Sequence, residues 1–115
     1  MTDTIVLTLP VETRFRSVAT LVLGGIGTRF DLPYERVDDL QLAVLSVLEA
    51  GGDGRVTLEV EGESGGLAVA IGPLVAGTGS DQALTRVLDP LVDAVEPGER
   101  DGVEWLTLRI GSSRR

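Results

Sequence analysis

The sequence predicts an α/β (α+β) two-layer sandwich, with a mostly antiparallel sheet of four or more strands covered on one face by three helices. Residues 55–61 alternate apolar and polar side chains, which is typical of a strand with one face in water. Apolar residues recur at steps of three and four over 12–30 and 34–50, which is typical of amphipathic helices. A chain of 115 residues with 43% hydrophobic side chains suits one domain, residues 1–115.

The first quarter of the chain is expected to form a strand and then a helix. Residues 4–9 are β-branched and aliphatic and end at Pro10, as in a short first strand. The helix expected over 12–30 contains a glycine cluster at 24–27, which we expect to allow close packing against another helix. Its core-facing stripe is expected to consist of Phe15, Val18, Val22, Ile26 and Phe30.

A second helix is expected over 34–50, with Asp31 as a candidate cap and Pro33 at an early helical position. Its apolar residues extend nearly all round, so it should be covered on most sides. Asp38 and Asp39 are expected to lie on its solvated face. The glycines of 51–54 should end the helix and turn the chain.

The second half is expected to contain a hairpin, a third helix and a last strand. Strands 55–61 and 67–71 form the hairpin, which Gly72-Pro73 ends. Ser80 or Asp81 caps the third helix, which Pro90 should break or kink, with Asp89 as a candidate cap for a second short segment. Its apolar residues are Leu84, Val87, Leu88, Leu91, Val92 and Val95. A charged turn over 96–102, a strand over 103–110 and a disordered tail over 112–115 complete the order β-α-α-β-β-α-β.

The composition excludes much of enzyme chemistry, because the sequence has no Cys, His, Lys or Asn. These absences remove thiolate and imidazole metal sites, Ser-His-Asp triads, Schiff bases and the phosphate-binding lysine of a P-loop. The net charge of −8 disfavours nucleic acid as a partner. No export signal and no membrane-length apolar run is present in this sequence, so the expected location is the cytoplasm.

Several polar positions have both a functional and a structural interpretation. Glu49 and Asp53 would share a face on a continuing helix and could bind Mg²⁺, although a solvated helix end is the simpler interpretation. The loop with Gly77, Gly79 and Ser80 precedes a helix and could hold an anion, or be an ordinary capped loop.

Two further features are candidates for contact with a partner. Arg14 and Arg16 lie on the first helix and point in different directions, so they are either solvated or part of an interface. Trp105 alternates with Leu106 and Leu108 on the last strand, so it is expected on the face away from the core. There it could anchor a partner or lie half-buried in the sheet.

Two segments carry a resemblance to a known family. The run 31–44, DLPYERVDDLQLAV, resembles the start of the second helix in anti-sigma-factor serine kinases. The run 83–95, ALTRVLDPLVDAV, is similar to the last helix of the same family, a branch of the GHKL (histidine-kinase-like ATPase, Bergerat) fold. The resemblance implies this fold over nearly the whole chain, and a role in transcription regulation through partner switching.

The resemblance also implies that the family's ATP site is degenerate here. Ser46 and Ala50 stand where active members have the catalytic Glu and the Mg²⁺-binding Asn, and Pro73 and Val75 stand where they have the adenine-binding Asp and a Gly. An unaided serine is a poor base, and alanine offers a cation no oxygen. The glycine-rich lid is reduced to residues 77–79. We therefore expect no cofactor, no metal site and no catalysis.

The expected function is that of an anti-sigma-like regulator that sequesters a sigma factor or engages a STAS-type anti-anti-sigma antagonist. The resemblance implies partner contacts through the first helix, at Arg14 and Arg16, with Thr20 at the position of a frequent family arginine. One alternative is an ATP-dependent serine kinase that uses non-standard Mg²⁺ and ATP ligands such as Glu49 and Asp53. Another is a self-associating structural subunit, and a homodimer is compatible with either.

Overall fold

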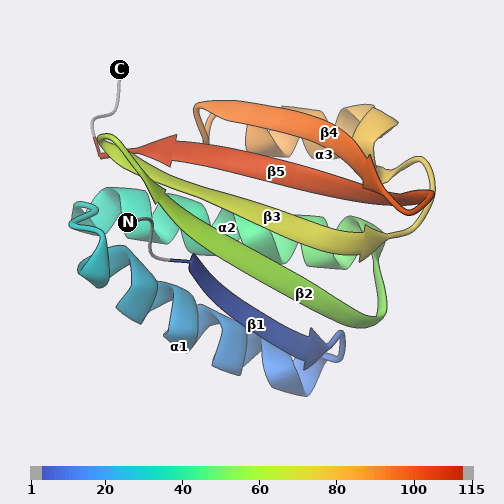
Figure 1. Ribbon diagram of the computed structural model, residues 1–115, viewed down its shortest axis with the longest axis horizontal. Coiled ribbons are helices and arrows are strands. Elements are labelled where there is room, and N and C mark those ends of the chain that lie inside the picture. Colours follow the sequence, from blue (N-terminus) through green and yellow to red (C-terminus); the bar gives the residue numbers. More distant parts are fainter. Residues whose placement is uncertain (1–3, 113–115) are drawn as a thin grey trace.

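The computed structural model describes residues 4–112. Five strands, three α-helices and one short 3₁₀ turn, η1, follow one another along the chain (Figure 1). In chain order they are β1 (Thr4–Pro10), α1 (Thr13–Arg29), α2 (Tyr34–Gly51), β2 (Gly52–Glu63), β3 (Gly66–Leu74), η1 (Thr78–Ser80), α3 (Gln82–Leu88), β4 (Ala94–Arg100) and β5 (Val103–Gly111).

The strands form one antiparallel sheet in the order β1-β2-β3-β5-β4. All three helices lie behind this sheet in Figure 1, so one face of the sheet is covered and the other is open. The two-layer sandwich expected from the sequence is therefore confirmed, with five strands in the sheet. No helix within residues 4–112 combines the length and the apolar character needed to cross a membrane.

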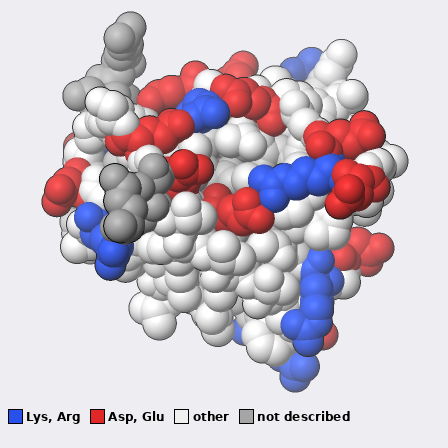
Figure 2. Space-filling model, in the orientation of Figure 1, with Lys and Arg blue, Asp and Glu red and all other residues white. Residues whose placement is uncertain are grey.

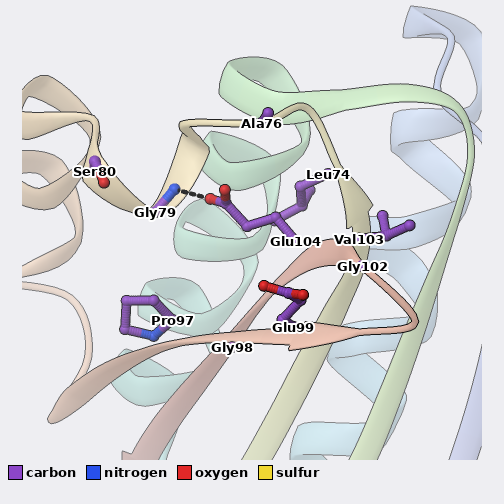
Figure 3. A pocket seen from close by; sticks show the side chains of 10 residues that line it. All are labelled: Leu74, Ala76, Gly79, Ser80, Pro97, Gly98, Glu99, Gly102, Val103 and Glu104. Carbon is purple, nitrogen blue, oxygen red and sulfur yellow. Dashed lines mark hydrogen bonds between the residues drawn. The ribbon is translucent and has the colours of Figure 1, made fainter.

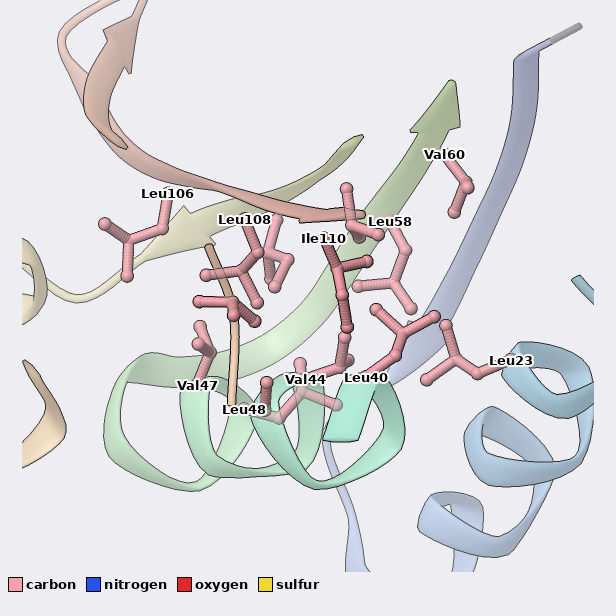
Figure 4. Packing of buried hydrophobic residues seen from close by; sticks show 14 of the residues in the cluster. Leu23, Leu40, Val44, Val47, Leu48, Leu58, Val60, Leu106, Leu108 and Ile110 are labelled. Atoms are coloured by element: carbon pink, nitrogen blue, oxygen red, sulfur yellow. The ribbon is translucent and has the colours of Figure 1, made fainter. Parts of the chain in front are cut away.

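The core lies between the sheet and α2, which is the most deeply buried helix. Every second residue of the central strands points to the helices, including Leu58, Val69 and Leu108, which are at most 1% exposed. Leu40, Val44 and Val47 of α2 meet them from the other layer (Figure 4). The alternation expected in 55–61 and 67–71 thus sets which side chains enter the core.

The helix α1 is turned relative to the expected stripe. Ala19, Leu23 and Ile26 are buried, whereas Val18 is 46% exposed and its inclusion in the stripe was wrong. The glycine cluster explains this rotation, because a Cβ on Gly27 would lie 2.6 Å from Val37 Cγ2 of α2. α1 and α2 can come this close only where α1 has no side chain, so α1 turns its Gly27 face toward α2.

The entry to α2 also differs from expectation. The residue before the first turn is Pro33, with no side-chain cap, and Asp31 takes a left-handed backbone (φ +60°) in the preceding turn. α2 is less covered than its composition suggested, since Leu42 is 53% exposed. α2 continues through Gly51, and the chain enters β2 at Gly52 with no separate turn.

The strand β4 is the main element that sequence reasoning missed. Its residues were expected to form the end of a helix and a charged turn, but α3 ends at Leu88 and Val95 lies on β4. Residues 89–93 form no second helical segment. Asp101 and Gly102 both have positive φ, which makes the two-residue turn of a β4–β5 hairpin. Only Ser112 of the expected tail is described, and its N–H donates to the Gly65 carbonyl; residues 113–115 lie outside the described residues.

A buried arginine joins the start of α2 to the far end of the sheet. Arg36 is 3% exposed, and its guanidinium bonds to the carboxylates of Asp39 and Asp93, at 3.0 Å each. Its Nε–H donates to the Gly111 carbonyl, and Nη1 also approaches the Leu91 carbonyl at 3.4 Å. Asp39 is therefore not on a solvated face as expected, because its side chain is only 13% exposed and is paired with Arg36.

We expect Arg36→Met to lower the free energy of unfolding by about 3 kcal/mol, because it leaves Asp39 poorly solvated without its cation. The matched control is Arg86→Met on the exposed side of α3, which should change stability by less than about 0.5 kcal/mol. Urea denaturation followed by circular dichroism measures both. Equal stability of the two variants would show that the Arg36 cluster contributes little.

Candidate functional site

The loop after β3 binds a carboxylate that belongs to the chain itself. The backbone N–H of Gly77 donates to Glu104 Oε1 at 2.9 Å, and the N–H of Gly79 donates to Glu104 Oε2. Figure 3 shows the Glu104 side chain directed from β5 toward the Gly79 amide. The two hydrogen bonds, with Gly79 the larger influence, hold the pKa of Glu104 below its ordinary value.

The position of this loop is set by its neighbours on both sides. Gly77 has φ +93°, which glycine adopts without strain, and its N–H faces Glu104 of β5. The Val75 N–H donates to the Gly51 carbonyl at the end of α2, at 2.8 Å. A Cβ on Gly51 would lie 2.3 Å from the buried Thr78 hydroxyl, so the loop and the helix end need a glycine to come this close.

The loop forms one wall of a hollow of about 680 Å³ at this end of the sheet. Ser80 lies on its rim with Gly79, and Pro97 and Glu99 of β4 form the opposite wall. The two amide donors expected as an anion site are therefore satisfied by Glu104. Glu104 had no special place in the sequence analysis, because only the fold brings it to residues 77 and 79.

A second, smaller hollow lies between α2 and α3, and two of the residues that the resemblance places at a nucleotide site line it. Ser46 and Ala50 line it together with Glu49 and Asp81, in a volume of about 250 Å³. The Ser46 hydroxyl donates to the Leu42 carbonyl at 2.7 Å, so its proton is engaged within the helix. Asp81 accepts from the N–H groups of Ala83 and Leu84, and so serves as the expected cap of α3.

The remaining positions of the expected nucleotide site do not converge. Pro73 and Val75 are exposed on either side of the buried Leu74. Glu49 and Asp53 lie on different elements, because α2 ends between them. Within the described residues, no group of three or more carboxylates is placed to hold a metal ion.

The two arginines of α1 that were candidates for partner contact differ in their exposure to solvent. Arg14 is exposed, pairs with Glu12 at 2.9 Å and lies over the Phe15 ring. Arg16 lies between α1 and α2, where its guanidinium is 3.9 Å from the Glu49 carboxylate and its Nε is buried without a hydrogen bond within the described residues.

Thr20, the third of these candidates, is part of the junction between the two helices. Its hydroxyl donates to the Arg16 carbonyl, and its own carbonyl accepts from Gln41 of α2 at 2.8 Å. The exposed apolar residues of α1 are instead Val18 and Leu21, the latter 79% exposed. The sequence analysis placed Val18 in the core and did not single out Leu21, because both positions fit an amphipathic helix equally well.

Trp105 lies half-buried on the open face of the sheet, away from the core as expected. Its ring packs on Gly72 of β3, where a Cβ would be 2.2 Å from the indole. The Arg100 guanidinium covers the other side of the ring at 3.9 Å from its centroid, and pairs with Glu59 of β2 at 2.9 Å. The tryptophan is thus held between a glycine and a cation.

Arg109 is a second arginine on the open face, since it alternates with the buried Leu108 and Ile110. Arg109 of β5 pairs with Glu96 of β4 at 2.8 Å and with Glu63 of β2. The hydrogen bond from Arg109 lowers the pKa of Glu96 below its ordinary value. Ion pairs therefore run across the strands on the open side, whereas the helix side is apolar.

No family model matches the chain, and the search of curated proteins found no match.

We expect Glu104→Gln to destabilise the protein at neutral pH, because an amide offers one acceptor oxygen to the two loop N–H groups. The folded-state pKa of Glu104 is lowered, so its stabilising effect is present above the ordinary glutamate pKa of about 4.3 and is lost as the pH falls through the lower folded-state value. The difference in unfolding free energy between wild type and variant should therefore shrink on acidification. Glu61→Gln, an exposed change, is the control and should show no such trend.

Proposed function

We propose that this chain is a cytoplasmic regulatory binding protein similar to anti-sigma factors of the GHKL fold, and that it acts without catalysis. Its partner would be a sigma factor, which it sequesters, or a STAS-type anti-anti-sigma antagonist, in a partner-switching pathway. The observation that carries the proposal is the state of the loop at 77–79. Its amide donors bind the chain's own Glu104, so phosphate would have to displace a resident carboxylate.

The hollow between α2 and α3 supports the same proposal. Ser46 and Ala50 stand there at the positions implied for the base and for the magnesium ligand, and neither side chain can serve. The carboxylates nearby belong to Glu49, at 3.9 Å from Arg16, and to Asp81, which caps α3. A nucleotide entering this hollow would meet two carboxylates, and none of the arginines within residues 4–112 lines it, which disfavours triphosphate binding.

The surface of α1 is the proposed site of partner binding. Leu21 and Val18 expose apolar side chains beside the charged Arg14, and the edge strand β1 exposes Val6. Exposed apolar side chains rimmed by charged residues are typical of a protein interaction site, and arginine is among the residues that most often carry binding energy there. Charged residues around them would set the orientation and choice of partner.

Calorimetric titration with ATP and Mg²⁺ separates this proposal from the kinase alternative. We expect binding no tighter than millimolar, because the loop amides are satisfied and the residues at the cation position offer no ligands. A micromolar dissociation constant would contradict the proposal and favour a serine kinase with non-standard ligands.

Affinity capture from the cell of origin tests the partner class. We expect a sigma factor or a STAS-domain protein to be retained by the wild type, and Leu21→Ser to reduce retention about fivefold to tenfold. The matched control is Tyr34→Ser, which changes a similarly exposed residue at the start of α2 and should leave retention of the partner unchanged. Recovery of only further copies of this chain would favour the self-associating subunit instead.

A further inference from the structure

The open face of the sheet contains a hollow of about 380 Å³ that the proposed function does not use. Its floor is formed by small side chains at the centre of the sheet, Ala68 and Ala70 of β3 and Thr107 of β5. Figure 2 looks onto this face and shows charged side chains around an uncharged centre. The hollow exists because the central strands carry small residues where their neighbours carry long ones.

The rim of the hollow is held in place by ion pairs between strands. Arg100 reaches across the sheet to Glu59, and Arg109 joins Glu63 to Glu96. Both guanidinium groups donate hydrogen bonds to the protein's own carboxylates, which partly neutralise their charge. The hollow is therefore preformed, and its arginines are poorly available to an anionic ligand.

The charge of the rim favours a cationic occupant. Four carboxylates, those of Glu59, Glu61, Glu63 and Glu96, surround two guanidinium groups, so two negative charges remain uncompensated. The Glu61 carboxylate forms no ion pair or side-chain hydrogen bond with another residue in 4–112, and Glu61 lies across Ala68 from Arg109. It is the carboxylate that a cation could reach at the least cost in broken contacts.

The shape of the site favours a side chain on a protein partner. We infer that the open sheet face docks a protein segment that places an arginine guanidinium on Glu61 and the aliphatic part of that arginine over Ala68 and Ala70. Arginine fits because its planar fork binds a carboxylate through two hydrogen bonds. Glu59 and Glu63 flank Glu61 at about 7 Å along β2. An extended segment with arginines at alternate positions would therefore place one guanidinium on Glu61 and its neighbours beside Glu59 and Glu63, whose charge is shared with Arg100 and Arg109.

This inference deepens the proposed function and rests on it only in taking the chain to be a protein-binding module. The docking face is on the opposite side of the sheet from α1, so the two surfaces could act at the same time (Figure 1).

The experiment is a titration of the ¹⁵N-labelled full chain with the peptide acetyl-ARARARA-amide. Shifts of backbone amide signals are expected along residues 59–63, 68–70 and 107–109. Glu61→Gln should weaken the dissociation constant at least fivefold. Glu49→Gln, the same loss of charge on the helix side, should change it less than twofold.

A second variant tests the shape of the hollow at unchanged charge. Ala70→Leu fills the floor with a residue that a strand accommodates well, so it should also weaken peptide binding at least fivefold while the circular dichroism spectrum is unchanged. Free arginine amide is the comparison for a small cation and should bind at least tenfold more weakly than the peptide.

Three outcomes would overturn the inference: equal weakening by Glu61→Gln and Glu49→Gln, shifts centred on the helices, or equal binding of arginine amide and peptide. The first two would indicate attraction by net charge alone, and the third a small-molecule site. None of these results involves a sigma factor or a STAS protein, so the proposed function would stand or fall separately.

Discussion

The buried guanidinium of Arg36 is the interaction on which the arrangement of the two layers depends. It bonds to Asp39 one turn further along α2, and to two places that are remote in sequence: the connection between α3 and β4 at Leu91 and Asp93, and the end of β5 at Gly111. Asp93 in turn accepts from the Gly111 N–H at 2.7 Å. A buried charge demands all these partners at once, so α2 can take only a narrow range of positions on the sheet.

At the candidate functional surfaces, too, charged side chains bind other groups of the same chain. Glu104 satisfies the loop that would otherwise offer free amides, and Arg100 and Arg109 are tied to carboxylates on other strands. In each case a group that could have bound a ligand binds the protein instead. The chain is acidic and has no lysine or histidine, so arginine is its only cationic side chain. On the open face, Arg100 and Arg109 already form ion pairs with glutamates of other strands. On the open face, within residues 4–112, Glu61 is the carboxylate without an ion pair, and α1 exposes apolar surface. Both features suit recognition better than chemistry.

Local sequence patterns were enough to predict the two layers of this fold. They could not predict features that depend on contacts between residues far apart in the sequence. Alternation in β2 and β3 identified the core side of both strands, and Asp81 was one of the two candidate caps of α3. β4 was missed because Pro97 and its charges hide the strand pattern, although the Asp101-Gly102 dipeptide is a hairpin signal that was open to reading. Arg36 and Glu104 could not have been found, since nothing near them in sequence shows that 93, 111, 77 and 79 would be their neighbours.

The sandwich of Gly72, Trp105 and Arg100 has an optical consequence. The chain has one tryptophan, so its intrinsic fluorescence comes from a single ring stacked under a cation at the end of the open face. Emission from that ring reports whether Arg100 stays in place. Events on the helix layer, beyond the thickness of the sheet, leave the indole's surroundings as they are. The protein thus carries a native probe that distinguishes its two sides without a label.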